Sequence, residues 1–130
     1  MQTRKLRILY VDDNDDTCFI VLTLLKRAGY TAVTADSIHG ALWLAQRESF
    51  DLHIMEKMLP DGSGLDLCRT LRAFKRFVPV IFYADDKCLA ERENALRAGA
   101  QFYVVKPHTN VLVETVHRLL SERKLTAPAA

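Results

Sequence analysis

Three carboxylates and one lysine follow the ends of apolar runs, and residues of these types could bind a cation. Asp12 and Asp13 follow the first apolar run, Glu56 follows the third, and Lys106 follows the fifth. Carboxylates gathered around one ammonium repel each other, so one of them has a raised pKa or the group binds a hard cation such as Mg²⁺. The lysine alone would neutralise the group only in part. These four residues form the candidate site if the fold brings them together.

Short apolar runs alternate with amphipathic segments along the chain and predict five strands and five helices. The predicted strands are Leu6–Val11, Thr31–Ala35, Asp51–Met55, Val78–Tyr83 and Gln101–Val105. The predicted helices are Asp15–Ala28, a segment capped by Ser37, a segment from Leu65 to about Lys75, Leu89–Ala98, and Thr109 to about Arg123, with a turn at 60–64. Such alternation favours an α/β fold, a doubly wound parallel sheet whose site lies outside the carboxyl ends of the strands.

Length and composition are typical of one globular domain. The chain has 130 residues, 49% of them hydrophobic, which is enough for one real core. We expect the domain to cover residues 1–124, with residues 125–130 (LTAPAA) as a tail or the start of a linker. Cys18, Cys68 and Cys88 are widely separated and indicate neither a disulfide framework nor a zinc site.

Charge and hydropathy exclude several partners. The net charge of +2 arises from 18 basic and 16 acidic residues that are scattered along the chain, without the clustered basic stripe of a nucleic-acid binder. The apolar run near the N-terminus is too short for a signal-peptide core or a membrane span. We therefore expect a cytoplasmic domain without a membrane partner.

Four stretches resemble the receiver domains of two-component response regulators, and together they span nearly the whole chain. They are the acidic pair in ILYVDD, the stretch 51–72 (DLHIMEKMLPDGSGLDLCRTLR), the strand VPVIF, and AGAQFYVVKP at 98–107. The resemblance implies a flavodoxin-like five-stranded sheet with the strand order 2-1-3-4-5. It also implies a phosphorelay signalling domain that acts through protein contacts rather than as an enzyme.

The resemblance assigns roles to the candidate residues. In receiver domains the acidic pair and a strand-three aspartate bind Mg²⁺, that aspartate accepts phosphate from a histidine kinase, and the lysine contacts the phosphoryl group. A strand-four Ser or Thr couples phosphate to a strand-five aromatic residue. In this chain Glu56 occupies the phosphoacceptor position and Ala84 the hydroxyl position. Tyr103 and Lys106 match the family, and the resemblance suggests a cis bond before Pro107.

Both departures argue against conventional phosphorylation. Glu56 carries its carboxylate one methylene farther out, which misaligns in-line attack on phosphorus. Ala84 has no hydroxyl to donate. Glu56 either reaches Lys106, imitating a phosphoryl group with about one negative charge instead of roughly −1.5 to −2, or is inert. We predict an atypical, phosphorylation-independent receiver, with weak Mg²⁺ binding through Asp13, Glu56 and the backbone carbonyl of Met58 as the residual metal chemistry.

The resemblance implies a protein partner, which would be a histidine kinase, an output domain or another regulator. It also makes plausible a homodimer through the face formed by the fourth helix, the fifth strand and the fifth helix. A receiver that still binds Mg²⁺ and switches is the first alternative.

A haloacid-dehalogenase-like phosphatase is the second alternative. The run 13–17 (DNDDT) fits its motif with Asp13 as nucleophile, and the pair Asp85-Asp86 could be its later acidic pair. Against this reading, Asp12 sits where that strand should still be apolar, and the length leaves no room for a cap module. A flavin protein would need hydroxyl and glycine residues in place of DDNDD.

Overall fold

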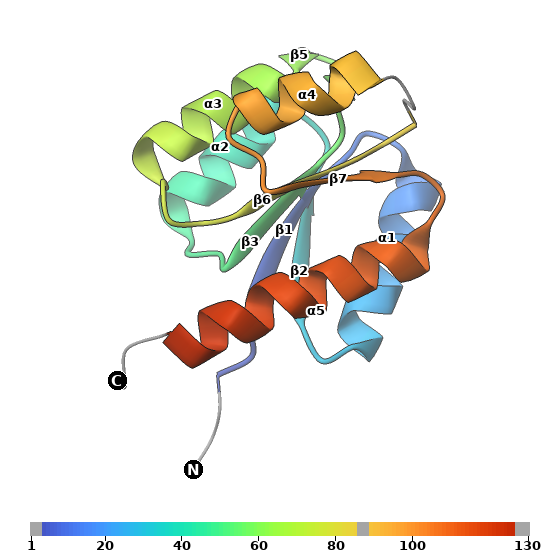
Figure 1. Ribbon diagram of the computed structural model, residues 1–130, viewed down its shortest axis with the longest axis vertical. Coiled ribbons are helices and arrows are strands. Elements are labelled where there is room, and N and C mark those ends of the chain that lie inside the picture. Colours follow the sequence, from blue (N-terminus) through green and yellow to red (C-terminus); the bar gives the residue numbers. More distant parts are fainter. Residues whose placement is uncertain (1–3, 86–88, 127–130) are drawn as a thin grey trace.

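The computed structural model describes residues 4–85 and 89–126, and its centre is a five-stranded parallel sheet (Figure 1). The strands are β1 (Arg7–Val11), β2 (Thr31–Ala35), β3 (Leu52–Met55), β6 (Val80–Ala84) and β7 (Phe102–Val105). They lie in the order β2-β1-β3-β6-β7. With the strands of the sheet counted in chain order, this arrangement agrees with the predicted order 2-1-3-4-5.

Helices cover both faces of the sheet (Figure 1). They are α1 (Asp15–Arg27), α2 (Ile38–Arg47), α3 (Gly64–Phe74), α4 (Leu89–Arg97) and α5 (Thr109–Thr126). One buried cluster joins the sheet to α1 and α5, and a second joins it to α2, α3 and α4. None of the described helices is long and apolar enough to cross a bilayer.

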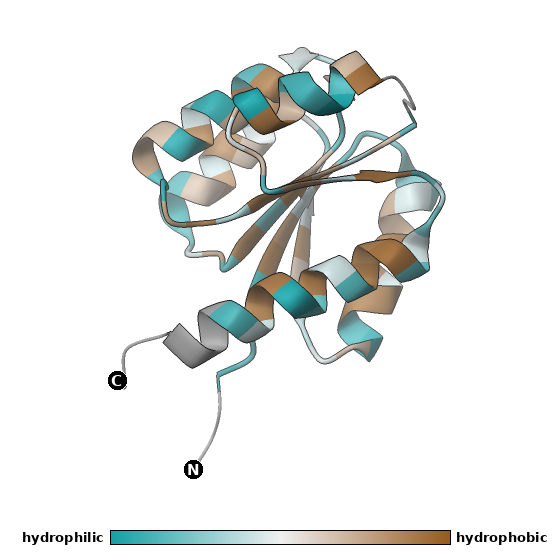
Figure 2. Cartoon of the chain, in the orientation of Figure 1, coloured by the Kyte–Doolittle hydropathy of each residue, from teal (hydrophilic) through white to brown (hydrophobic). Residues whose placement is uncertain are grey.

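The central strands are apolar on both sides, as Figure 2 shows by their brown colour. In β1, Ile8 and Tyr10 belong to the α1 and α5 cluster, whereas Leu9 and Val11 belong to the opposite one. All four side chains are fully buried. A strand covered by helices on both faces needs apolar residues at every position, which explains the continuous runs in the sequence.

Local signals in the sequence set the helix ends. Ser37 caps α2 by accepting a hydrogen bond from the Gly40 backbone amide at 3.0 Å, as the sequence predicted. Gly29 after α1 has φ of +98° and Gly99 after α4 has φ of +112°. Only glycine adopts this left-handed conformation readily, so each glycine ends the helix before it.

The structure differs from the prediction at several boundaries. The predicted turn at 60–64 contains the tip and the second strand of a small antiparallel hairpin of β4 (Met58–Leu59) and β5 (Gly62–Ser63), and it ends at the first residue of α3. Strand β3 begins one residue late because the Asp51 carboxylate accepts hydrogen bonds from the Arg4 guanidinium and the Arg7 amide. Helix α5 continues to Thr126, inside the predicted tail. Residues 127–130, Asp86 and Cys88 lie outside the described residues.

Candidate functional site

The carboxyl ends of three strands bring Asp12, Glu56 and Lys106 to one edge of the sheet. Each residue follows its strand directly, β1 for Asp12, β3 for Glu56 and β7 for Lys106. The Nζ atom of Lys106 lies 2.7 Å from Oδ2 of Asp12 and 3.6 Å from Oε2 of Glu56. The ammonium is thus shared between two carboxylates, and it hydrogen-bonds to Asp12.

Asp12 is the most deeply buried member of the site, with 1% of its surface exposed. Besides Lys106, its Oδ2 atom accepts a hydrogen bond from the Tyr10 hydroxyl at 2.7 Å. Its Oδ1 atom accepts one from the backbone amide of Asn14 at 3.0 Å. A buried carboxylate is tolerated only when it is paired and hydrogen-bonded, and Asp12 meets both conditions.

Sequence reasoning missed Tyr10, which it treated as one apolar residue of a strand. The signal was present, because residues two positions apart on a strand face the same side and a buried tyrosine hydroxyl usually needs a partner. Tyr10 precedes Asp12 by two positions, and its hydroxyl therefore reaches the Asp12 carboxylate.

Asp13 does not join this group and is exposed. Across residues 4–85 and 89–126 the structure contains no group of three or more His, Cys, Asp or Glu side chains arranged to hold a metal ion. The predicted acidic pocket is thus formed by Asp12 and Glu56, with Asp13 on the surface beside it. The side chains expected to bind Mg²⁺ do not form a ready donor set.

Glu56 is held in place by its backbone, whose amide donates to the Val11 carbonyl at 2.9 Å. Its side chain is only 13% exposed, and its Oε2 atom accepts no hydrogen bond from the described residues. Burial raises the pKa of Glu56, and the charge of Asp12 adds to this, while Lys106 and a backbone hydrogen bond oppose it. The ionised carboxylate is therefore less stable here than in water.

Lys106 remains a cation in spite of its burial. Burial by itself lowers the pKa of Lys106, but the hydrogen bond to Asp12 and the charges of Glu56 and Asp12 outweigh it, so the pKa is raised. Its ammonium also lies 5.8 Å from the centre of the Tyr83 ring. The Lys106–Pro107 peptide bond is cis.

Ala84 and Tyr103, the two positions for which the resemblance implies a switch role, lie on β6 and β7. Ala84 ends β6 and is 1% exposed. Tyr103 packs against the α2, α3 and α4 cluster, and its ring stacks on Phe82 with the ring centres 6.4 Å apart. The Tyr103 ring therefore points inward.

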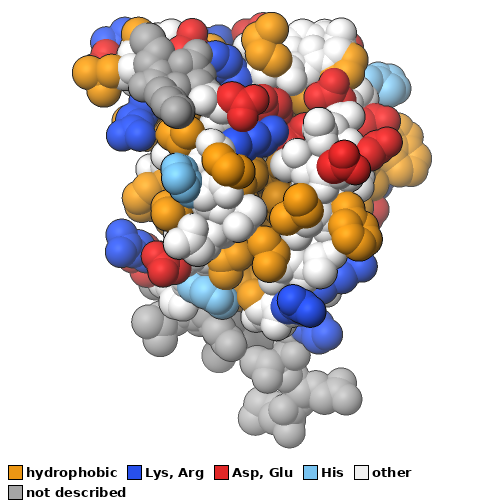
Figure 3. Space-filling model, turned by 90° about the vertical axis from the view of Figure 1, so that its right-hand side faces the viewer, with side chains coloured by type: hydrophobic (Ala, Val, Ile, Leu, Met, Phe, Trp, Pro, Cys, Tyr) orange, Lys and Arg blue, Asp and Glu red, His pale blue; other side chains and the backbone are white. Residues whose placement is uncertain are grey.

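Neighbouring residues frame the site. Lys57, which directly follows Glu56, forms an ion pair with Glu91 of α4 at 3.4 Å. Met58 is 67% exposed. Figure 3 views the right-hand side of the molecule in Figure 1, where acidic side chains gather near a basic one and beside hydrophobic ones.

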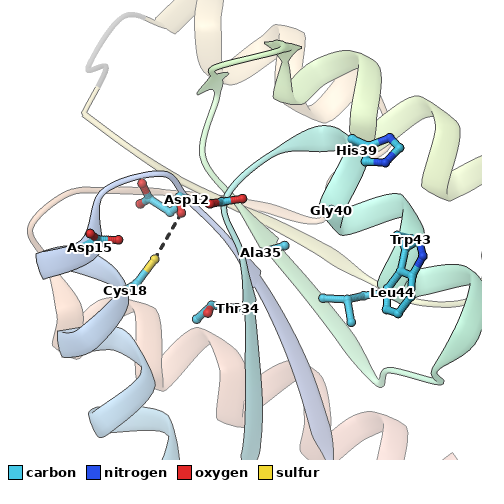
Figure 4. Close-up of a pocket in the computed structure, with 10 residues that line it drawn as sticks. Asp12, Asp15, Cys18, Thr34, Ala35, His39, Gly40, Trp43 and Leu44 are labelled. Atoms are coloured by element: carbon cyan, nitrogen blue, oxygen red, sulfur yellow. Dashed lines mark hydrogen bonds between the residues drawn. The ribbon is translucent and has the colours of Figure 1, made fainter.

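A hollow of about 470 Å³ lies between α1 and α2 and reaches Asp12 (Figure 4). Asp15, Cys18, His39 and Trp43 also line it. The Cys18 thiol donates to the Asp12 carbonyl at 3.2 Å, and burial, followed by the charge of Asp12, raises the pKa of Cys18 to about 11. The thiol is therefore protonated at neutral pH and is a poor nucleophile.

We predict that Glu56→Gln stabilises the protein at neutral pH. A raised carboxyl pKa means that the folded state binds the proton more tightly, so stability falls as the pH rises from the ordinary value of 4.5 through the raised one. The variant avoids this loss, and we expect a gain below about 1 kcal/mol, since the attraction of Lys106 offsets much of the cost of burial. Urea unfolding at pH 4 and pH 7 measures it.

The gain in stability of the Glu56→Gln variant should be present at pH 7 and absent at pH 4. The exposed Glu93→Gln on α4 is the matched control and should change stability at neither pH. A Glu56→Gln variant that is destabilised at pH 7 would show that attraction to Lys106 outweighs the cost of burial.

Comparison with known proteins shows which family this chain belongs to. The family model "Response regulator receiver domain" matches residues 8–117. The chain is 27% identical over 120 residues to the cell cycle transcriptional regulator CtrA of Caulobacter vibrioides, and 30% identical over 125 residues to the alkaline phosphatase synthesis transcriptional regulatory protein PhoP of Bacillus subtilis. These matches cover 92% and 95% of this chain, and 52% of each relative. The chain thus spans about half the length of these relatives.

Solved structures of response regulators have the same fold as this chain. The chemotaxis response regulator CheY4 of Vibrio cholerae matches with a TM-score of 0.84 and 26% identity, over 89% of this chain and 99% of that one. The non-phosphorylated HemR receiver domain from Leptospira biflexa matches with a TM-score of 0.85 and 28% identity, over 97% of this chain and 100% of that one. The chain belongs to the response regulator receiver domain family.

Proposed function

We propose that this receiver domain signals through protein contacts without accepting a phosphoryl group. The observation that carries the proposal is the residue at the phosphoacceptor position. Glu56 follows β3 and faces Lys106 with its carboxylate 3.6 Å from the ammonium. A carboxylate therefore already lies beside the lysine, at the position that a phosphoryl group takes in the family.

The chemistry of phosphoryl transfer supports the proposal. Catalysis in such a site comes almost entirely from positioning and from charge stabilisation. The extra methylene of Glu56 displaces the nucleophile, and the described side chains form no ready donor set for a metal ion. Ala84 cannot donate a hydrogen bond to a phosphoryl oxygen.

The Glu56–Lys106 pair is also the basis for a fixed signalling state. It provides about one negative charge, whereas a phosphoryl group carries roughly −1.5 to −2. Tyr103 already points inward and stacks on Phe82. We propose that the domain holds one conformation, set by these contacts rather than by phosphate. Any Mg²⁺ binding through Asp13, Glu56 and the Met58 carbonyl would be weak.

The partner is proposed to be a protein. CtrA and PhoP are named as transcriptional regulators and are about twice as long as the match, which favours an output domain, a histidine kinase or another regulator. The face of α4, β7 and α5 is proposed as a homodimer surface. The described residues of this face include the exposed apolar side chains of Leu89, Leu96 and Val111, and exposed apolar surface favours association.

Incubation with acetyl phosphate and Mg²⁺, followed by intact mass measurement, tests the proposal. We expect no addition of a phosphoryl group to the wild-type chain. The DrrB receiver domain, whose solved structure is described as BeF3 activated and which is 27% identical to this chain, is the positive control. A phosphoryl group on Glu56 would show instead that the domain is a switchable receiver.

A further inference from the structure

The Tyr10 hydroxyl contacts the same carboxylate oxygen as Lys106. It donates to Oδ2 of Asp12 at 2.7 Å, and the Lys106 ammonium lies at 2.7 Å from that oxygen. The Asn14 amide donates to the other oxygen at 3.0 Å. Asp12 thus has partners on both oxygens, and three different elements supply them.

The Tyr10 ring has little freedom to release this contact. Tyr10 is fully buried in the cluster that joins the sheet to α1 and α5. The hydroxyl is the donor to Oδ2 of Asp12, because an ionised carboxylate can only accept hydrogen bonds. The contact is therefore a constant feature of the folded domain.

We propose that Tyr10 is a positioning residue that holds Asp12 on Lys106 and thereby competes with a divalent cation for that carboxylate. Mg²⁺ demands near-ideal octahedral geometry and oxygen ligands that are free to turn toward it. In receiver domains the acidic pair helps to hold Mg²⁺, so Asp12 would have to join Asp13, Glu56 and the Met58 carbonyl around the cation. An Asp12 carboxylate bound by Tyr10, Lys106 and Asn14 must give up at least one of these partners to do so. The inference rests on the proposed function, because it explains how the Asp12–Lys106 contact is kept without a metal ion or a phosphoryl group.

Removal of the single hydroxyl tests the inference. We expect Tyr10→Phe to bind Mg²⁺ about tenfold more tightly than the wild-type chain, since one hydrogen bond to a charged group is worth at least that factor. The affinity is measured by following the amide resonances of Asp13 and Asn14 during titration with MgCl₂. Tyr83→Phe is the matched control, because it removes the hydroxyl of another buried tyrosine near Lys106, and it should leave the affinity unchanged.

The wild-type chain provides a second measurement in case Tyr10→Phe folds poorly. The Tyr10 hydroxyl proton is buried and hydrogen-bonded, so we expect it to exchange slowly with water and to give its own resonance. Saturating MgCl₂ should shift that resonance or abolish it. Mg²⁺ binding that leaves it unchanged, or equal affinities in Tyr10→Phe and wild type, would overturn the inference.

The two proposals fail separately. Phosphorylation of Glu56 by acetyl phosphate would contradict the proposed function while leaving the effect of Tyr10→Phe on Mg²⁺ affinity to be measured. An unchanged affinity in Tyr10→Phe would remove the role of Tyr10 and leave the argument from Glu56 and Ala84 intact.

Discussion

Replacing Lys106 by Met is expected to destabilise the domain by about 3 kcal/mol, because loss of one partner leaves a buried charge uncompensated. Asp12 is 1% exposed, and its carboxylate would keep the hydrogen bonds from the Tyr10 hydroxyl and the Asn14 amide. Chemical denaturation with a two-state fit measures the loss. The raised pKa of Lys106 means that its stabilisation is fully present below the ordinary value of 10.5 and is lost only as the pH rises through the folded value.

Two further variants test whether the cost of Lys106→Met comes from the burial of its ion pair or would follow the loss of any ion pair. The exposed pair Arg69–Asp66 spans 3.1 Å, and Arg69→Met should cost less than about 1 kcal/mol. The double variant Asp12→Asn with Lys106→Met removes both charges and should recover part of the stability lost in Lys106→Met. If Lys106→Met costs no more than Arg69→Met, the Asp12–Lys106 pair does not stabilise the site as we describe.

Gly64→Ala is expected to be the most damaging small substitution near the site. A Cβ atom at Gly64 would lie 2.2 Å from the Glu56 carbonyl oxygen and 3.1 Å from Cε1 of Phe82. The backbone at Gly64 cannot easily move away from Glu56, because the Gly64 amide donates a hydrogen bond to the Lys57 carbonyl at 2.7 Å. Overpacking of this kind costs about 1–3 kcal/mol or more, and here it also displaces Glu56. Thermal melting and the Glu56 amide resonance report the two effects.

Gly29→Ala provides the comparison for Gly64→Ala. Nothing lies within 4 Å of the added Cβ atom, but φ is +98°. The cost should therefore be backbone strain alone, about 1–2 kcal/mol, with no change at Glu56. Equal effects on the Glu56 resonance would show that Gly64 has no special role in holding that residue.

The sheet and its helices could be predicted because the central strands β1, β3 and β6 are buried on both faces and several helix ends carry their own signal. Ser37, Gly29 and Gly99 set helix ends through the backbone chemistry of single residues. The β4–β5 hairpin could not be predicted in the same way. Its strands are two residues long, and Asp61 at its turn accepts hydrogen bonds from the amides of Ile38 and His39, 23 and 22 positions away in the chain.

From the sequence, the site could be predicted only as a set of residue types at strand ends. Sequence reasoning selected Asp12, Glu56 and Lys106, which the parallel sheet brings together. It could not decide which carboxylate holds the ammonium, since that depends on burial and on the Tyr10 hydroxyl. It also could not place Asp13, because adjacent residues at a strand end diverge according to the path of the loop.

An amide NMR titration of the domain with Mg²⁺, and then with Mg²⁺ plus beryllofluoride, tests the central claim most directly. Beryllofluoride is a phosphoryl analogue that needs a receptive carboxylate, and a solved receiver 27% identical to this chain is described as activated by it. We predict that beryllofluoride leaves the resonances of Glu56, Ala84 and Tyr103 where Mg²⁺ alone left them. Shifts that spread from Glu56 through Ala84 to Tyr103 would show a pocket that still switches with phosphate.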